Sequence, residues 1–145
     1  MDYWKQITIE ANAAFERQDY QSARKLYTCA CDRAQKLLPF WFDSHEALIV
    51  LSISYQNLAD LYVRLDDAKN VFHCYQVLIS RLKQFNTDTT DHEFTIKNIV
   101  NRIRTDLLLA IKNLDLAFSE TDLLIQDIGQ LSTNSLEKII EEHCQ

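Results

Sequence analysis

Two stretches decide the fold of this chain: ANAAFERQDYQSARKLYTCA at residues 11–30 and ADLYVRLDDAKNVFHCYQVL at residues 59–78. In each stretch apolar residues recur every three or four positions on both sides of a short polar break, which is typical of two amphipathic helices. The breaks, at residues 18–20 and 66–68, are so short that the flanking helices must run antiparallel. Each stretch therefore predicts a helical hairpin.

The two hairpins match each other position by position, which indicates an internal repeat. The first helix carries a small residue, the second helix carries another aliphatic residue twelve positions on, and a tyrosine follows four positions later. The matched pairs are Ala11 with Ala59, Ala23 with Val71, and Tyr27 with Tyr75. Small residues let the helices approach closely, and each tyrosine fills the space between the hairpins.

The helical pattern continues outward from these hairpins over the whole chain. It predicts five main helices at about residues 2–17, 20–38, 43–65, 68–85 and 91–114, followed by two short ones at about 122–128 and 134–143. Capping boxes at residues 43–46 and 90–93 open the third and fifth helices. We therefore expect an all-α fold in a single domain spanning residues 1–145.

Composition excludes several other classes of protein. Among 145 residues there is one glycine, Gly129, and one proline, Pro39. Turn-rich β folds and glycine-rich phosphate loops need many more. No nucleophile elbow, His-Glu-x-x-His motif or paired Cys-x-x-Cys zinc spacing is present, so we expect neither an enzyme nor a resident metal or cofactor.

Charge, hydropathy and cysteine usage favour a cytoplasmic protein. The net charge is −6, and the whole excess lies in residues 115–145, which hold one lysine and seven acidic residues. Without a basic stripe, neither nucleic acid nor an anionic membrane is an expected partner. No apolar run reaches membrane-spanning length, and the first residues do not resemble a signal peptide. In a reducing cytoplasm the four cysteines are expected to be buried free thiols: Cys29, Cys31, Cys74 and Cys144.

The repeated pattern resembles the tetratricopeptide repeat. The resemblance covers residues 4–37 and 52–85, and implies a short solenoid of stacked hairpins. It departs from that family in two ways. Tandem units of the family recur every 34 residues or so, whereas residues 38–51 are inserted between these hairpins. Residues 91–145 lack the small-residue pattern, and are expected to form either a degenerate third repeat or only capping helices.

The resemblance implies binding of an extended or helical peptide in a concave groove lined by the first helix of each pair. Such a protein would serve as an adaptor, a regulator or a small chaperone, and its size, charge and fold are similar to those of bacterial chaperones that escort secreted substrates. The expected partner-binding residues include Ile9, Ser52 and Asn98, and above all Asn12, Glu16, Gln56, Asn57, Asp60, Arg64 and Arg102.

Two further features bear on recognition. Some members of that family hold a peptide carboxylate with lysines and asparagines; Asn12 and Asn57 fit such a clamp, but Thr8 stands where its first lysine would be. Without those cations a carboxylate would be poorly neutralised. The aromatic segment 40–42 either fills the core or presents Trp41 to a partner.

Two alternatives stay open at this point. The insertion, the aromatic segment or the C-terminal helix could instead form a two-fold homodimer that leaves no open groove. The cysteines could serve a thiol or metal sensor, although Cys29 and Cys31, two positions apart, point away from each other on a helix.

Overall fold

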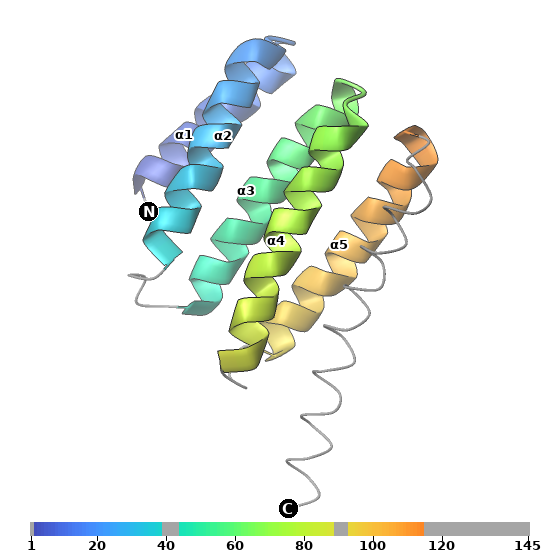
Figure 1. Cartoon of the computed structure of the whole chain (residues 1–145). Helices are drawn as coiled ribbons and strands as arrows, with labels where there is room; N and C mark the ends of the chain where they lie inside the picture. The colour runs from blue at the N-terminus through green and yellow to red at the C-terminus, as the bar shows by residue number, and fades with distance from the viewer. Residues whose placement is uncertain (1, 39–43, 89–92, 115–145) are drawn as a thin grey trace, which may run out of the picture.

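A computed structural model of the chain describes residues 2–38, 44–88 and 93–114 (Figure 1). The elements are five helices: α1 (Asp2–Glu16), α2 (Tyr20–Leu37), α3 (Ser44–Arg64), α4 (Ala68–Asp88) and α5 (Glu93–Leu114). No strand occurs within these three ranges. The all-α prediction is confirmed, and the helix bounds lie within three residues of the predicted ones. The first residues of the two capping boxes, at positions 43 and 90, fall outside the described residues, as do Trp41 and the two short C-terminal helices.

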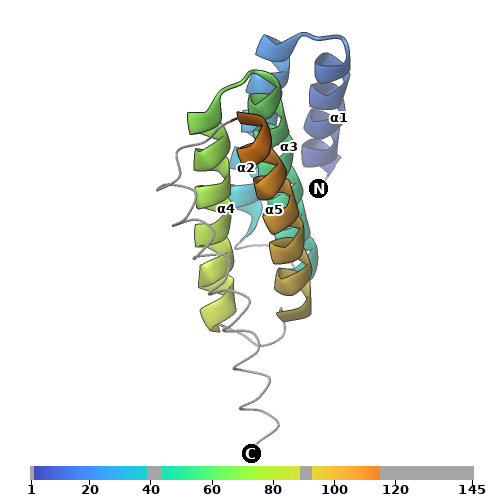
Figure 2. The same cartoon turned by 90° about the vertical axis from the view of Figure 1, so that its right-hand side faces the viewer.

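The helices form two antiparallel hairpins that pack side by side, with α5 at the end. α1 pairs with α2 and α3 with α4, while α3 also packs against both α2 and α5. Figure 2 shows that α4 lies on the same side of α3 as α2 does of α1, so that α2 and α4 share one side of the molecule. The other side is formed by α1, α3 and α5.

The first hairpin turns at Gln18, whose φ of 64° places it in the left-handed region. The amide of Gln18 donates to the carbonyl of Phe15 at 3.0 Å, and the amide of Asp19 donates to the carbonyl of Ala14 at 2.9 Å. This is the Schellman arrangement that satisfies the last carbonyls of a helix. The turn therefore needs no glycine, although the conformation is one that glycine adopts most easily.

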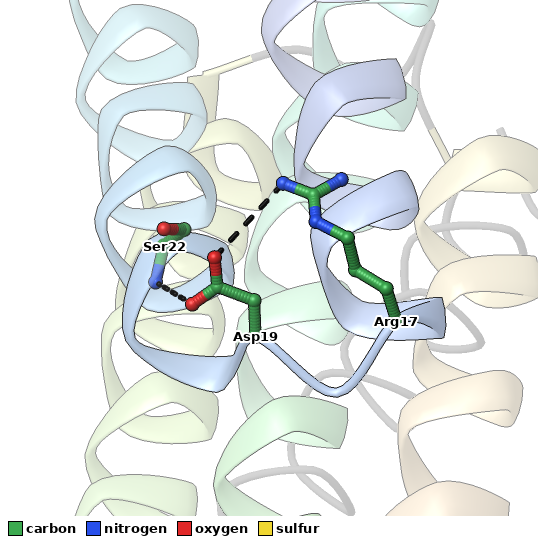
Figure 3. Close-up of polar contacts among 3 residues, drawn as sticks. All are labelled: Arg17, Asp19 and Ser22. Atoms are coloured by element: carbon green, nitrogen blue, oxygen red, sulfur yellow. Dashed lines mark hydrogen bonds and ion pairs between the residues drawn. The ribbon is translucent and has the colours of Figure 1, made fainter.

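Asp19 then caps the helix that follows (Figure 3). Its Oδ1 accepts from the backbone amide of Ser22 at 3.2 Å, and its Oδ2 lies 4.0 Å from Nη2 of Arg17. Hydrogen bonding from Ser22 is the main cause that lowers the pKa of Asp19, because it favours the charged carboxylate. A single residue thus ends one helix and starts the next.

The second hairpin repeats this turn 48 positions later in the sequence. Asp66 has a φ of 56°, its amide donates to Val63, and the amide of Asp67 donates to Tyr62 at 2.9 Å. Asp67 caps α4 as Asp19 caps α2, since its Oδ1 accepts from the amide of Asn70 at 3.3 Å. The predicted correspondence between residues 18–20 and 66–68 is therefore confirmed, because both turns form the same backbone hydrogen bonds.

Small residues form the helix contacts, as the repeat predicts. The fully or almost fully buried alanines are Ala11, Ala14, Ala23, Ala30, Ala34 and Ala59. The two matched tyrosines are also buried, Tyr27 with 4% and Tyr75 with 2% of its surface exposed. Side chains without long branches let the helix backbones come close, and the tyrosines fill the volume that remains.

Hydrogen bonds between buried or half-buried side chains fix the first hairpin on the second. Nε1 of Trp4 donates to Oγ of Ser54 at 2.8 Å, in the buried contact between α1 and α3. Nε2 of Gln35 donates to the hydroxyl of Tyr55 at 3.0 Å, which joins α2 to α3. Because buried polar groups need partners, these two bonds specify how the hairpins sit against each other.

The insertion and α5 extend this arrangement. α3 begins at Ser44, and the added first turns bury Ala47, Leu48 and Leu51. This agrees with the expectation that part of the insertion lengthens the third helix. Leu107 of α5 lies 48 positions after Ala59 and is 1% exposed. α5 therefore extends the layer formed by α1 and α3, but it carries a leucine at the position where those helices carry Ala11 and Ala59.

A search for membrane-spanning segments among the described helices found none of sufficient length and apolarity.

The contact at Ala11 can be tested with a pair of leucine substitutions on α1. Ala11→Leu should lower the free energy of unfolding by about 1–3 kcal/mol, because a fully packed site has no room for the added carbons. Ala13→Leu is the control, since Ala13 is exposed on the same helix and should change stability by less than about 0.5 kcal/mol. Urea unfolding followed by circular dichroism measures both. Equal effects at the two positions would contradict the packing described above.

Candidate functional site

The side chains expected to bind a partner do not all lie where the sequence places them. Asn12, Glu16, Asp60 and Arg102 are exposed, on α1, α3 and α5. Asn57 is half-buried beside Asp60 on α3. Together with Asp106, these residues form what we call the polar face: Asn12, Glu16, Asn57, Asp60, Arg102 and Asp106.

The prediction for Gln56 was wrong in one respect. Gln56 is 4% exposed and Ser52 is 5% exposed, so this half of the polar stripe on α3 is buried. The four-residue spacing correctly places Ser52, Gln56 and Asp60 along one side of the helix. The sequence did not reveal that another helix covers that side, and α5 packs against α3.

Arg64 is exposed, as expected, but it is engaged at the junction of the hairpins. Its Nε donates to the hydroxyl of Tyr20 at 3.2 Å, at the start of α2. Arg64 therefore connects α3 to the first hairpin. Ile9 and Asn98 are exposed on α1 and α5, as expected.

Tyr27 links α2 to the polar face. Its hydroxyl donates to Oδ1 of Asn12 at 2.5 Å, which holds the Asn12 side chain in place from beneath. Burial raises the pKa of Tyr27, and the negative charges of Asp60 and Glu16 raise it further. The tyrosine was expected only to fill space between the hairpins; its hydroxyl also orients a predicted binding residue.

The charges of α3 and α5 meet at Asp60. Asp60 is exposed on the surface, yet protein atoms surround its carboxylate closely enough that desolvation raises its pKa to about 6. The carboxylate of Asp106 adds to this increase, and the guanidinium of Arg102 opposes it. Burial also raises the pKa of Asp106, again opposed by Arg102. Among the described residues, Arg102 is thus the one cation that opposes the raised pKa of both carboxyl groups.

Sequence reasoning missed Asp106. The available clue is its position one helical turn after Arg102, on the side of α5 that carries other expected binding residues. Tyr75, on α4, is close enough to both carboxylates that they raise its pKa beyond the effect of burial. The site is therefore built from three exposed helix faces with tyrosines beneath them.

Three cysteines, Cys29, Cys31 and Cys74, lie on α2 and α4 rather than on the helices of the polar face. Cys31 and Cys74 are buried as expected, and burial raises the pKa of both thiols, that of Cys74 to about 12. Cys29 is exposed on α2, which corrects the expectation that its thiol is buried. It lines a shallow depression with Arg24, Lys25, Thr28, Asp32 and Tyr62. Within residues 2–38, 44–88 and 93–114 there is no group of three His, Cys, Asp or Glu residues suited to a metal ion.

Comparison with protein families gave a match over residues 2–115 to DUF2753, described as a protein of unknown function. The chain belongs to the DUF2753 family. The matched range begins with α1 and includes all of α5, so the match covers the five helices that carry the polar face. Comparisons with curated proteins and with solved structures gave no match.

The electrostatics of Asp60 can be tested through stability. In the folded chain its pKa is raised above the ordinary value of 3.8, so the ionised form is the one that folding disfavours. Asp60→Asn should therefore raise the melting temperature by a few degrees at pH 7.5. The gain should shrink as the pH falls from 7.5 to 4.0, because the wild-type carboxyl becomes protonated on that side of its folded pKa.

Asp32→Asn is the matched control, since it removes one negative charge from an exposed position on α2. It should leave the melting temperature nearly unchanged at both pH values. A destabilised Asp60→Asn at pH 7.5 would show that the carboxylate makes a favourable contact, contrary to the description above.

Proposed function

We propose that this chain is a protein-binding module of tetratricopeptide-like type, which receives an extended or helical segment of another protein on the polar face. The observation that carries the proposal is the exposure of four polar residues on three neighbouring helices: Asn12 and Glu16 on α1, Asp60 on α3 and Arg102 on α5. In this role the chain would act as an adaptor, a regulator or a small chaperone. The proposal assigns it no catalytic step.

The repeated hairpin supports a tetratricopeptide-like assignment. The two turns share a Schellman bond pattern and an aspartate cap at a constant spacing of 48 positions. Stacking of equivalent hairpins places equivalent helix faces next to each other, which produces a continuous surface that a linear segment can follow. Asn12 and Asp60 occupy the same place in their repeats, 48 positions apart, and both are exposed.

The polar face is held rigid before any partner arrives. The Tyr27 hydroxyl fixes Asn12, and Trp4, Ser54 and their neighbours fix the relative position of α1 and α3. A prearranged surface loses less conformational entropy on binding, which favours affinity. Amide side chains such as those of Asn12 and Asn57 can both donate to and accept from the backbone of an extended segment.

A cytoplasmic location also belongs to this proposal. The three cysteines in the described part of the chain, Cys29, Cys31 and Cys74, are all free thiols. Free thiols are typical of proteins that work in a reducing compartment.

A double substitution tests the polar face as the binding surface. Asn12→Ala with Asn57→Ala should abolish the capture of a partner from native lysate, because both amides that would contact the segment are removed. The matched control is Gln21→Ala with Gln76→Ala, two exposed polar residues on α2 and α4. Capture is read by mass spectrometry, and circular dichroism shows whether each variant keeps its helices.

Unaltered capture by the Asn12 and Asn57 variant would overturn the assignment of the polar face and redirect attention to the aromatic segment 40–42. Loss of capture in the control variant alone would place the binding surface on α2 and α4.

A further inference from the structure

The side of the molecule formed by α2 and α4, which we call the basic side, carries an excess of positive charge. Within their bounds these two helices hold seven lysine or arginine residues and two aspartates, a net charge of +5. α1, α3 and α5 together hold six cations and seven acidic residues, a net charge of −1. Residues 1–114 have no net charge, so it is the layering of the helices that separates the charges.

The cations of the basic side all reach solvent. Four of them are exposed and three are half-buried: Arg24, Lys25, Lys36 and Lys69, then Arg33, Arg81 and Lys83. The aspartates of the two turns lie at one end of this side, where Asp19 and Asp67 cap α2 and α4. A row of cations along two neighbouring helices attracts an anionic partner.

The basic side is also hollowed at two equivalent places. The first depression is the one beside Cys29, and Arg24 and Lys25 contribute its two cations. The second is lined by His73, Gln76, Val77, Ser80 and Arg81 of α4. Four residues of each depression match at the repeat spacing of 48 positions: Lys25 with His73, Thr28 with Gln76, Cys29 with Val77, and Asp32 with Ser80. The repeat thus forms the same concavity twice, with an arginine in each.

The chain itself contains an acidic segment that starts next to this side. α5 packs against α4, and Figure 1 shows that α5 ends at the same end of the molecule at which α4 begins. The next 31 residues, 115–145, carry one lysine and seven acidic residues, a net charge of −6. α4 has 21 residues and is about 31 Å long. The segment is therefore long enough to follow α4 and to reach α2.

We propose that the acidic segment 115–145 docks on the basic side of its own chain, with carboxylates placed beside the cations of the two depressions. A charge of −6 then meets a charge of +5. Because the segment is covalently joined to α5, its effective concentration at the basic side is high, and this favours it over an acidic segment of another protein. The inference goes beyond the proposed function, since it concerns the side of the molecule opposite the polar face.

Charge also disfavours the other surface that the segment could cover. The polar face holds three carboxylates, those of Glu16, Asp60 and Asp106, against the single arginine Arg102. Like charges placed together in an interface are costly, so an acidic segment is repelled from this face. Docking on α2 and α4 consequently leaves the polar face open to a partner.

Zero-length carbodiimide cross-linking of the full chain tests the proposal, because this reagent joins a lysine amine only to a carboxylate in direct contact with it. Mass spectrometry identifies the linked residues. Carboxylates of 115–145 should link to the four lysines of the basic side with about fivefold the yield found at Lys5 and Lys97, which are exposed on α1 and α5. Raising the salt concentration to about 0.5 M should lower that yield about threefold, because salt screens exposed charges.

A double arginine variant provides the matched comparison. Arg24→Gln with Arg81→Gln removes one cation from each depression but keeps every lysine that can react, so the yield at the basic side should fall about threefold. The control, Lys5→Gln with Lys97→Gln, removes the same charge from α1 and α5 and should change this yield by less than about 1.5-fold. Circular dichroism shows whether each variant keeps its helices, and the salt series on the unchanged chain tests the same attraction if the arginine variant does not fold.

A mixture of isotope-labelled and unlabelled chains shows which chain the segment occupies. Links within one isotopic form support docking on the same chain. Links between the two forms in about half of the pairs at equal concentrations would place the segment on a second copy and overturn the inference. Equal yields at Lys5, at Lys97 and at the basic side would also overturn it. So would the absence of any link to the basic side, a result that would leave α2 and α4 to an acidic segment of another protein.

Discussion

The close approach of helices at alanine is the constraint on which the rest of this structure depends. Ala11 and Ala59 have no exposed surface, and the second helix of the first hairpin meets α1 through Ala23, which is likewise fully buried. Small side chains at these places set a short distance between the helices, and that distance leaves room for one large ring per hairpin. Tyr27 and Tyr75 occupy that room, and the Tyr27 hydroxyl reaches Asn12 on α1.

This packing connects the core to the site. Because Tyr27 is held beneath α1, its hydroxyl can fix Asn12, and its position next to Asp60 couples the two hairpins electrostatically. α5 completes the arrangement by packing against α3 and bringing Asp106 towards Asp60. The resulting surface has an ordered Asn12 on α1 and a charge-rich contact between α3 and α5. In the proposed function, both would contact the partner.

Local features of the fold could be predicted because they depend on residues near one another in the sequence. Helical periodicity located the five helices, and the short polar breaks that contain Asp19 and Asp67 located both turns. Exposure on α3 could not be predicted in the same way, because the burial of Gln56 depends on the packing of α3 against helices elsewhere in the sequence. Asp106 could not be identified from the sequence for the same reason: it acts on the pKa of Asp60, which belongs to another helix. Cys29 shows a smaller limit: it is exposed while Ala30 and Cys31, the next two residues of the same helix, are buried, and only the packing of α2 decides which thiol is outside.

Site-specific photo-cross-linking tests the central claim most directly. Benzoylphenylalanine is introduced at Glu16 on α1, at Arg102 on α5, or at Gln76 on α4, all of them exposed positions. In cells that make the protein, we expect the probes on α1 and α5 to form a cross-link to the same partner, and the probe on α4 to form none. A cross-link from the α4 position alone would contradict the account, because it would place the partner on the opposite side of the molecule.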